Sequence, residues 1–129
     1  MIKELTVQNY KELVENSNKI LFIDFYSPYC GPCQQLLPFL KTLDKHFENE
    51  NVQILKCNTS KETKIAEKYL IQSVPTTLIV DLNKKIKSPE LGLKDPSYYV
   101  NSIQKELNKQ LSLLDKLKKI IFFYSHIKK

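Results

Sequence analysis

The sequence predicts an α/β domain in which helices cover both faces of a mixed β-sheet. Two apolar runs, ILFIDFY at residues 20–26 and VQILKC at residues 52–57, have the composition of buried central strands. Segments with apolar residues every three or four positions separate these runs from later strands, so strands and helices alternate. The 129 residues have the length of one domain and can bury a core without disulfide bridges.

Several elements are bounded by residues that favour a helix start or stop. Thr6, Ser60 and Asp95 stand where helices are expected to begin, and these residue types are preferred N-caps. Pro32 suits a first helical turn, whereas Pro38 falls inside the same helix and should kink it. In chain order we predict a strand over 2–5, a helix from 6 to about 15, a strand over 20–26, a helix from 32 to 47, a strand over 52–57, a helix over 61–69, strands over 76–81 and 85–87, and a helix from 96.

The charge is uneven along the chain, and the composition excludes some functions. The formal net charge is +6, and residues 105–129 carry +5 of it through seven Lys and two acids. All basic residues are Lys, whereas bidentate recognition of guanine is typical of Arg, so we expect no nucleic-acid partner. With two glycines in all, the chain has no Rossmann or P-loop nucleotide motif.

The cysteine count and the apolar runs favour a cytoplasmic protein. Three cysteines, an odd and low number, argue against a secreted scaffold held by disulfides. No apolar run is long enough to span a bilayer, and the first residues, MIKELTVQNYKELVE, lack the apolar stretch of a secretory signal. We therefore expect a cytoplasmic location.

Cys30 and Cys33 form a C-x-x-C pair where a strand turns into a helix. Free backbone N–H groups and the helix dipole stabilise a thiolate there, so Cys30 is the candidate nucleophile. Cys33, one turn further in, is expected to be more buried and to resolve the mixed disulfide. The alternative is half of a zinc site, but Cys57, His46 and His126 form no second pair. We therefore expect no metal.

Two charged residues interrupt the central strands. Asp24 lies six residues before Cys30 in an otherwise apolar run, where an ionised carboxylate is costly unless it is paired or functional. Burial would raise the pKa of Asp24 and let it exchange a proton with Cys33. Lys56 interrupts the other central strand and is a candidate partner of Asp24. The alternative is that Asp24 faces solvent at an edge of the sheet.

The motif IDFYSPYCGPC at residues 23–33, together with Pro38, Lys56 and the VPT sequence at residues 74–76, resembles the thioredoxin family. The order and spacing of these features match over about residues 1–108. The resemblance implies a thioredoxin fold in a domain over residues 1–108. An extended basic C-terminal helix, residues 109–129, would then follow beyond the usual end of the family.

The resemblance also implies a role for each matched residue. Cys30 corresponds to the nucleophile and Cys33 to the resolving cysteine, with Asp24 as the buried acid and Lys56 as its partner. Pro38 corresponds to the proline that kinks the active-site helix. The remaining matches form a substrate-binding set around the dithiol: Tyr29, Gly31, Pro32, Val74, Pro75 and Gly92.

The resemblance implies a more detailed role for three residues of this set. An X-Pro bond is trans by default, but the resemblance implies that Pro75 is the family's cis-proline, which faces the disulfide. The backbone at Val74 can then pair with a bound substrate strand, and Gly92 corresponds to the glycine of the substrate-binding groove. Tyr26 and Tyr29 replace the tryptophans that usually flank the site, so the resemblance implies an aromatic surface there.

The implied activity is the reduction of protein disulfides by thiol–disulfide exchange. Gly31 and Pro32 between the cysteines are typical of reducing thioredoxins, whose dithiol is restored by an NADPH-dependent thioredoxin reductase. The two thiols carry the electrons, so no cofactor is expected. The competing hypothesis is an adaptor that docks on a partner or a membrane. Cys57 is interpreted as a small buried side chain, with a regulatory thiol as the alternative.

The helical pattern continues past the usual end of the family. Apolar residues recur at three- and four-residue steps from Val100 to Tyr124, and a helix over 96–124 would be about 43 Å long. Three hypotheses compete: an apolar stripe folded onto the domain, a partner or dimer contact, and docking on an anionic membrane surface. The membrane hypothesis depends on five lysines: Lys116, Lys118, Lys119, Lys128 and Lys129.

Overall fold

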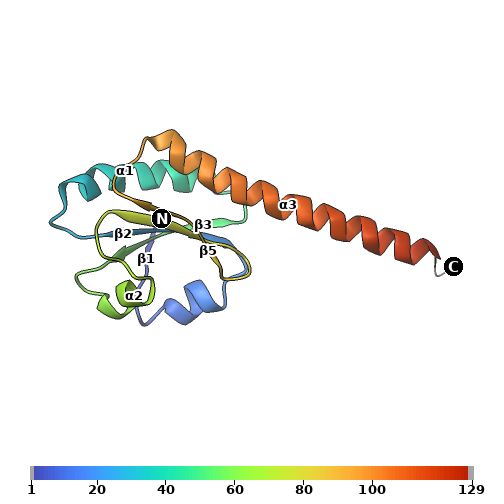
Figure 1. The fold of residues 1–129 in the computed structure, drawn as a ribbon, viewed down its shortest axis with the longest axis horizontal. Coiled ribbons are helices and arrows are strands. Elements are labelled where there is room, and N and C mark those ends of the chain that lie inside the picture. The colour runs from blue at the N-terminus through green and yellow to red at the C-terminus, as the bar shows by residue number, and fades with distance from the viewer. Residues whose placement is uncertain (1, 128–129) are drawn as a thin grey trace.

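The computed structural model describes residues 2–127 and has the predicted α/β architecture (Figure 1). The elements are β1 (Lys3–Glu4), the π-helix η1 (Lys11–Glu15), β2 (Ile20–Tyr26), α1 (Gly31–His46), β3 (Val52–Asn58), α2 (Thr63–Lys68), β4 (Thr76–Val80), β5 (Ile86–Leu91) and α3 (Pro96–Ile127). Within the described residues, five strands form one mixed sheet in the order β1-β3-β2-β4-β5. Strands β1, β3 and β2 are parallel, while β4 is antiparallel to β2 and to β5. The predicted order of elements is therefore confirmed.

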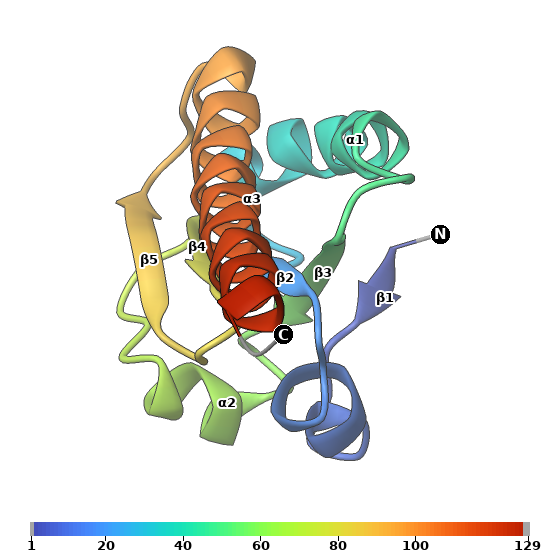
Figure 2. The same ribbon diagram turned by 90° about the vertical axis from the view of Figure 1, so that its right-hand side faces the viewer.

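The alternation of side chains along the strands divides the core into two layers. Even-numbered residues of β2 and β3 pack against α1 and α3, as in the cluster that includes Phe22, Ile54 and Ile103. Odd-numbered residues of the same strands pack against η1 and α2 on the other face, as Ile23 and Leu55 do. Figure 2 shows α1 and α3 on one side of the sheet and α2 on the other. The parity of a residue in β2 or β3 thus decides which helices it faces.

The predicted cap at Ser60 is wrong, because that residue closes a turn ahead of α2, whereas Thr6 makes the reciprocal bonds of a helix cap in the turn that precedes η1. The Thr6 hydroxyl oxygen accepts the Asn9 N–H at 3.3 Å, and Asn9 Oδ1 accepts the Thr6 N–H at 2.8 Å, all before η1 begins. The Ser60 N–H donates to Asn58 Oδ1 at 2.9 Å in the turn after β3, and α2 begins three residues later. Side chains of these types bond to the backbone in turns as readily as at caps.

The last strand is longer than predicted, whereas the last cap is confirmed. Strand β5 has six residues, where the sequence predicted three, and it contains Pro89. An edge strand tolerates a proline because one side of its backbone makes no ladder bonds. Asp95 caps α3, since its Oδ1 accepts the Ser97 N–H at 3.0 Å. Helix α1 continues through Pro38 as a single element.

Helix α3 begins on the sheet and ends far from it. Tyr99, Ile103 and Leu107 are buried against the sheet, whereas the side chains from residue 111 to 127 are exposed. With 32 residues the helix is about 48 Å long, and Figure 1 shows its second half projecting away from the domain. The hypothesis that this stripe folds onto the domain is therefore wrong. None of the helices described in the structure is long and apolar enough to cross a bilayer.

Candidate active site

The two cysteines lie at the start of α1, joined by a disulfide. Cys30 is the N-cap residue of the helix, in an extended conformation, and its Sγ accepts the Cys33 N–H at 3.2 Å. Cys30 is half-buried, whereas Cys33 is fully buried. The predicted difference in exposure is confirmed, so an approaching substrate meets the sulfur of Cys30 and not that of Cys33.

This arrangement favours an ionised sulfur at Cys30 once the disulfide is reduced. The Cys33 N–H already points at Cys30 Sγ, and it belongs to the first turn of α1, where backbone N–H groups lack partners inside the helix. A helix N-terminus carries partial positive charge and stabilises an anion. Pro32 lies in the same turn, where its missing N–H costs no hydrogen bond.

The segment before β4 lies directly against the disulfide. Cys30 Sγ is 3.6 Å from the carbonyl oxygen of Val74. The Val74–Pro75 peptide bond is cis, as the resemblance implies and against the default expectation for an X-Pro bond. The Gly92 N–H donates to the Pro75 carbonyl oxygen at 2.8 Å, and Gly92 has a φ of 80°, which glycine adopts without strain. The structure therefore brings Val74, Pro75 and Gly92 together beside Cys30.

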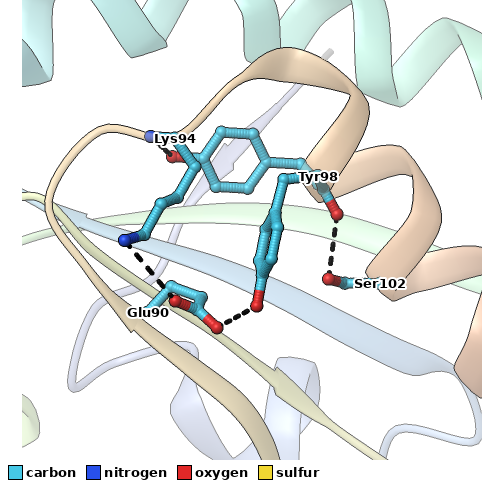
Figure 3. A network of polar contacts seen from close by, with 5 residues as sticks. Glu90, Lys94, Tyr98 and Ser102 are labelled. Carbon is cyan, nitrogen blue, oxygen red and sulfur yellow. Dashed lines mark hydrogen bonds and ion pairs between the residues drawn. The ribbon is translucent and has the colours of Figure 1, made fainter.

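The loop that carries Gly92 is held by contacts that the sequence did not indicate (Figure 3). The Tyr98 hydroxyl donates to Glu90 Oε1, and Lys94 Nζ lies 3.9 Å from Glu90 Oε2. The Lys94 N–H donates to the Tyr99 hydroxyl oxygen at 2.8 Å. These bonds join the end of β5 to the first turn of α3. They join two elements through the loop between them, and no local pattern in the sequence predicts them.

One of the two tyrosines near the dithiol contributes an aromatic surface. Tyr29 is 94% exposed, and the neighbouring Gly31 and Pro32 are also exposed. Tyr26 is 8% exposed, and its hydroxyl donates to Glu4 on β1. The expectation that both tyrosines replace the flanking tryptophans on the surface is therefore wrong for Tyr26, whose ring packs inward.

Asp24 is a fully buried acid on the central strand β2. Neither of its carboxylate oxygens has a hydrogen-bond partner within the described part of the chain. Burial raises the pKa of Asp24 to about 7, while the charge of nearby Lys56 lowers it and that of Glu4 raises it. The alternative of a solvent-facing edge position is wrong, since β3 and β4 flank β2 on either side.

Lys56 does not form the ion pair with Asp24 that the sequence suggested. Although the β2–β3 register places Asp24 opposite Lys56, Lys56 Nζ lies 3.6 Å from Glu4 Oε1. The reason is the edge strand β1, whose register places Glu4 opposite Lys56 from the other side. Strand pairing between residues so distant in sequence could not be derived from local patterns.

Cys57 follows Lys56 on β3 and is directed to the opposite face of the sheet. It is fully buried in the cluster that faces η1 and α2, whereas Cys33 is buried under α1. Burial raises the pKa of the Cys57 thiol to about 12, which opposes its reaction as a thiolate. This position favours the interpretation as a small apolar side chain. Among residues 2–127 there is no cluster of three or more His, Cys, Asp or Glu that could hold a metal ion.

Comparison with known proteins assigns the family. A family model described as thioredoxin matches residues 1–111. The chain belongs to the thioredoxin family. A thioredoxin-like protein of Synechocystis is 31% identical over 96 residues, which cover 74% of this chain and 90% of that protein. Thioredoxin from Buchnera aphidicola is 35% identical over 91 residues, covering 70% of this chain and 82% of the relative.

Two other thioredoxins match a smaller part of this chain or share fewer identical residues with it. The chloroplastic thioredoxin Y of rice is 38% identical over 77 residues, and the match spans 60% of this chain and 45% of the rice protein. The crystal structure of oxidised mitochondrial thioredoxin 3 from Saccharomyces cerevisiae superposes with a TM-score of 0.70 at 25% identity, covering 81% of this chain and 94% of that chain. Thioredoxins are protein-disulfide oxidoreductases, and the Cys30–Cys33 disulfide is the group that such exchange requires.

Proposed function

We propose that this thioredoxin works as a reductant of protein disulfides, with Cys30 as the nucleophile. The observation that carries the proposal is the half-buried Cys30 sulfur at the start of α1, above a fully buried Cys33 and against the Val74 carbonyl. A substrate segment that reaches Cys30 also meets the exposed surface of Tyr29, Gly31 and Pro32.

The exchange takes place in two displacements. The Cys30 thiolate attacks one sulfur of a substrate disulfide, so that a mixed disulfide forms and the other substrate sulfur leaves as a thiolate that takes up a proton. Cys33 then gives up its thiol proton, for which Asp24 is the acceptor, and attacks Cys30 Sγ. The second substrate thiolate leaves, and the Cys30–Cys33 disulfide remains. Two electrons have passed from the dithiol to the substrate.

The proposed partners follow from this chemistry and from the family. The dithiol is restored by two electrons from an NADPH-dependent thioredoxin reductase, and the chain itself carries no cofactor in this cycle. One similar structure concerns the thiol resolving mechanism of yeast mitochondrial 1-Cys peroxiredoxin via glutathione/thioredoxin systems, which supports oxidised thiol proteins as a substrate class. We place the protein in the cytoplasm, a compartment that keeps such dithiols reduced. Fractionation of cells followed by detection of the chain tests this location.

Reduction of insulin by dithiothreitol tests the activity. We expect the wild-type protein to accelerate precipitation of the insulin B chain and Cys30→Ser to give the uncatalysed rate. Cys33→Ser should capture insulin in a stable mixed disulfide on Cys30, visible by non-reducing electrophoresis. Equal rates for the wild type and Cys30→Ser would refute the proposed function.

A second candidate function, docking on an anionic membrane surface, is favoured by the end of α3. At about 100° per residue, a set of apolar side chains occupies an arc of about 140° of the helix. Each is between 50% and 66% exposed: Leu113, Leu114, Leu117, Ile120, Ile121 and Ile127. Lys116 and Lys118 lie at the two edges of this arc, where their charged ends can reach lipid headgroups.

The charge distinguishes a membrane from a second copy of the chain. Pairing two such helices along this arc would bring like charges together, because residues 105–129 carry a net charge of +5. Anionic lipid instead complements that charge. The β2–α1 loop with the dithiol lies at the end of the molecule opposite the C-terminal end of α3, so docking leaves the site accessible (Figure 1). Lys128 and Lys129, which the membrane hypothesis included, lie outside the described residues.

Sedimentation with vesicles tests the docking function. We expect the full chain to bind vesicles of phosphatidylcholine and phosphatidylserine at low salt, and to bind pure phosphatidylcholine weakly. A variant with Lys116, Lys118 and Lys119 replaced by Gln keeps the apolar arc and should lose the preference for phosphatidylserine. A chain that forms dimers in sedimentation equilibrium and shows no such preference would contradict membrane docking.

A further inference from the structure

Four polar side chains from three strands gather at one end of the face that α1 and α3 cover. Glu4 on β1 and Asp24 on β2 both lie opposite Lys56 on β3 in the strand register. Tyr26 lies two residues beyond Asp24 on β2 and therefore on the same face. The chain leaves this end of β2 to reach Cys30. One lysine thus stands between two carboxyl groups, one partly exposed and one fully buried.

The partly exposed Glu4 carboxylate binds both Lys56 and Tyr26, whereas the buried Asp24 carboxyl group binds neither. Glu4 Oε1 accepts the Tyr26 hydroxyl and lies 3.6 Å from Lys56 Nζ. The same Lys56 Nζ is 5.9 Å from the centre of the Tyr26 ring, so the lysine is held over the ring as well. Within the described residues, Asp24 has no hydrogen-bond partner. The strand register would allow Lys56 to contact either Glu4 or Asp24. The side-chain conformations therefore decide that Lys56 contacts Glu4.

We propose that Glu4 is a positioning residue of the dithiol site: it holds Lys56 and Tyr26 away from Asp24, so that the buried carboxyl has no direct ion-pair partner and can take up a proton. The inference rests on the proposed function, in which Asp24 takes up the Cys33 proton. A carboxyl group paired with Lys56 would stay ionised and bind that proton poorly.

The physical reason is competition between two carboxylates for one ammonium group. Lys56 keeps 30% of its side-chain surface exposed while it contacts Glu4, and burying its charge next to Asp24 would cost that hydration. Burial and the bond to Glu4 raise the pKa of Tyr26 above its usual value, so Tyr26 remains a hydrogen-bond donor to Glu4. Removing the Glu4 charge would leave Lys56 with Asp24 as the remaining carboxylate of the cluster.

Within the described part of the chain, the other elements that pack around Asp24 place no further charged group beside it, so Glu4 and Lys56 determine how its pKa is shifted by charge. From α3, the Tyr99 hydroxyl feels the charge of Asp24, and burial raises its pKa, so it stays neutral. From α1, Cys33 is held in the disulfide, and from β4 the register neighbour is Thr77, which does not titrate. Of the two charged neighbours, Lys56 lowers the pKa of Asp24 and Glu4 raises it.

Carbon-13 NMR of the Asp24 carboxyl group in the oxidised full-length protein tests the inference. In the oxidised state Cys30 and Cys33 do not titrate, so the Asp24 signal is free of coupling to the dithiol. We expect Glu4→Gln to move the midpoint of the Asp24 titration down by about one pH unit, because Lys56 turns to Asp24. Glu4→Asp, which keeps the charge, should restore most of the wild-type midpoint. Glu12→Gln, an exposed site on η1, is the matched control and should leave the midpoint unchanged.

A double variant separates positioning from simple repulsion between the two acids. With Lys56→Gln as the background, adding Glu4→Gln should move the midpoint by less than half of the shift it causes in the wild type. An equal shift in both backgrounds would overturn the inference, since Glu4 would then act by its own charge. An unchanged midpoint in Glu4→Gln would overturn it as well.

Insulin reduction by the same preparations keeps the two proposals apart. If the wild type reduces insulin and Glu4→Gln leaves the Asp24 midpoint in place, the inference alone fails. If the wild type does not reduce insulin, the proposed function fails, whatever the titration gives.

Discussion

Replacing Asp24 by Asn should stabilise the oxidised protein more as the pH rises. The Asp24 carboxyl group is fully buried, with no hydrogen-bond partner among the described residues, so its ionisation in the folded state is costly. In the unfolded chain it ionises freely. The folded protein therefore pays an electrostatic cost at high pH that the Asn variant does not have.

The magnitude follows from the pKa of Asp24, which burial raises from 3.8 to about 7. Between these two values the folded state binds more protons than the unfolded state, so the free energy of unfolding falls as the pH increases. Each pKa unit corresponds to about 1.4 kcal/mol, which gives a total loss of about 4 kcal/mol. About 2.5 kcal/mol of this loss falls between pH 5 and pH 8. Below about pH 4 the Asp24 carboxyl group is largely protonated in both states, so the free energy of unfolding has not yet been reduced by its ionisation.

Urea unfolding of the oxidised wild type and of Asp24→Asn at pH 5 and pH 8 measures this difference. We expect the stability of the variant relative to the wild type to rise by about 2.5 kcal/mol over this interval. Asp115→Asn makes the same chemical change at an exposed position of α3 and should show no such rise. A relative stability of Asp24→Asn that stays constant or falls with pH would refute the burial of an uncompensated carboxyl group.

Three further substitutions test separate parts of the structure. Gly92→Ala should cost about 1–2 kcal/mol in urea unfolding, because the φ of 80° is strained for alanine although a Cβ there would meet no atom of the described residues within 4 Å. Asp95→Ala should cost about 1 kcal/mol through loss of the α3 cap and leave the rate of insulin reduction unchanged, whereas an unaltered stability would contradict the capping bond. Cys57→Ala should also leave that rate unchanged, since Cys57 lies on the other face of the sheet from the dithiol; a slower rate would support a regulatory thiol.

The sequence predicted most of the fold because its signals are local. Apolar runs predicted β2 and β3, and the pair Asp95–Pro96 predicted the start of α3. The extent of β5 was underestimated, since Pro89 and the polar residues around it carry no strand signal outside the edge position. The cap at Ser60 was misplaced because the same type of side chain also closes turns. The end of α3 was ambiguous, since an amphipathic stripe does not specify which surface covers it.

The candidate site was predictable where it depends on sequence spacing and less so where it depends on pairing across strands. The C-x-x-C pair at a helix start implies that Cys30 is more exposed than Cys33, as the half-buried Cys30 and the fully buried Cys33 are. The ion pair between Lys56 and Glu4 needs the β1–β3 register, which has no local signal. The contacts of Glu90 with Tyr98 and Lys94 likewise join parts of the chain whose mutual orientation only the folded structure defines.

The redox potential of the Cys30–Cys33 couple tests the central claim most directly. Equilibration of the full chain with glutathione buffers, followed by alkylation and mass analysis, gives the fraction reduced at each ratio. A reductant of the proposed type should have a potential of about −270 mV, the value typical of thioredoxins. A potential of about −180 mV or higher, as in disulfide isomerases and oxidases, would contradict it.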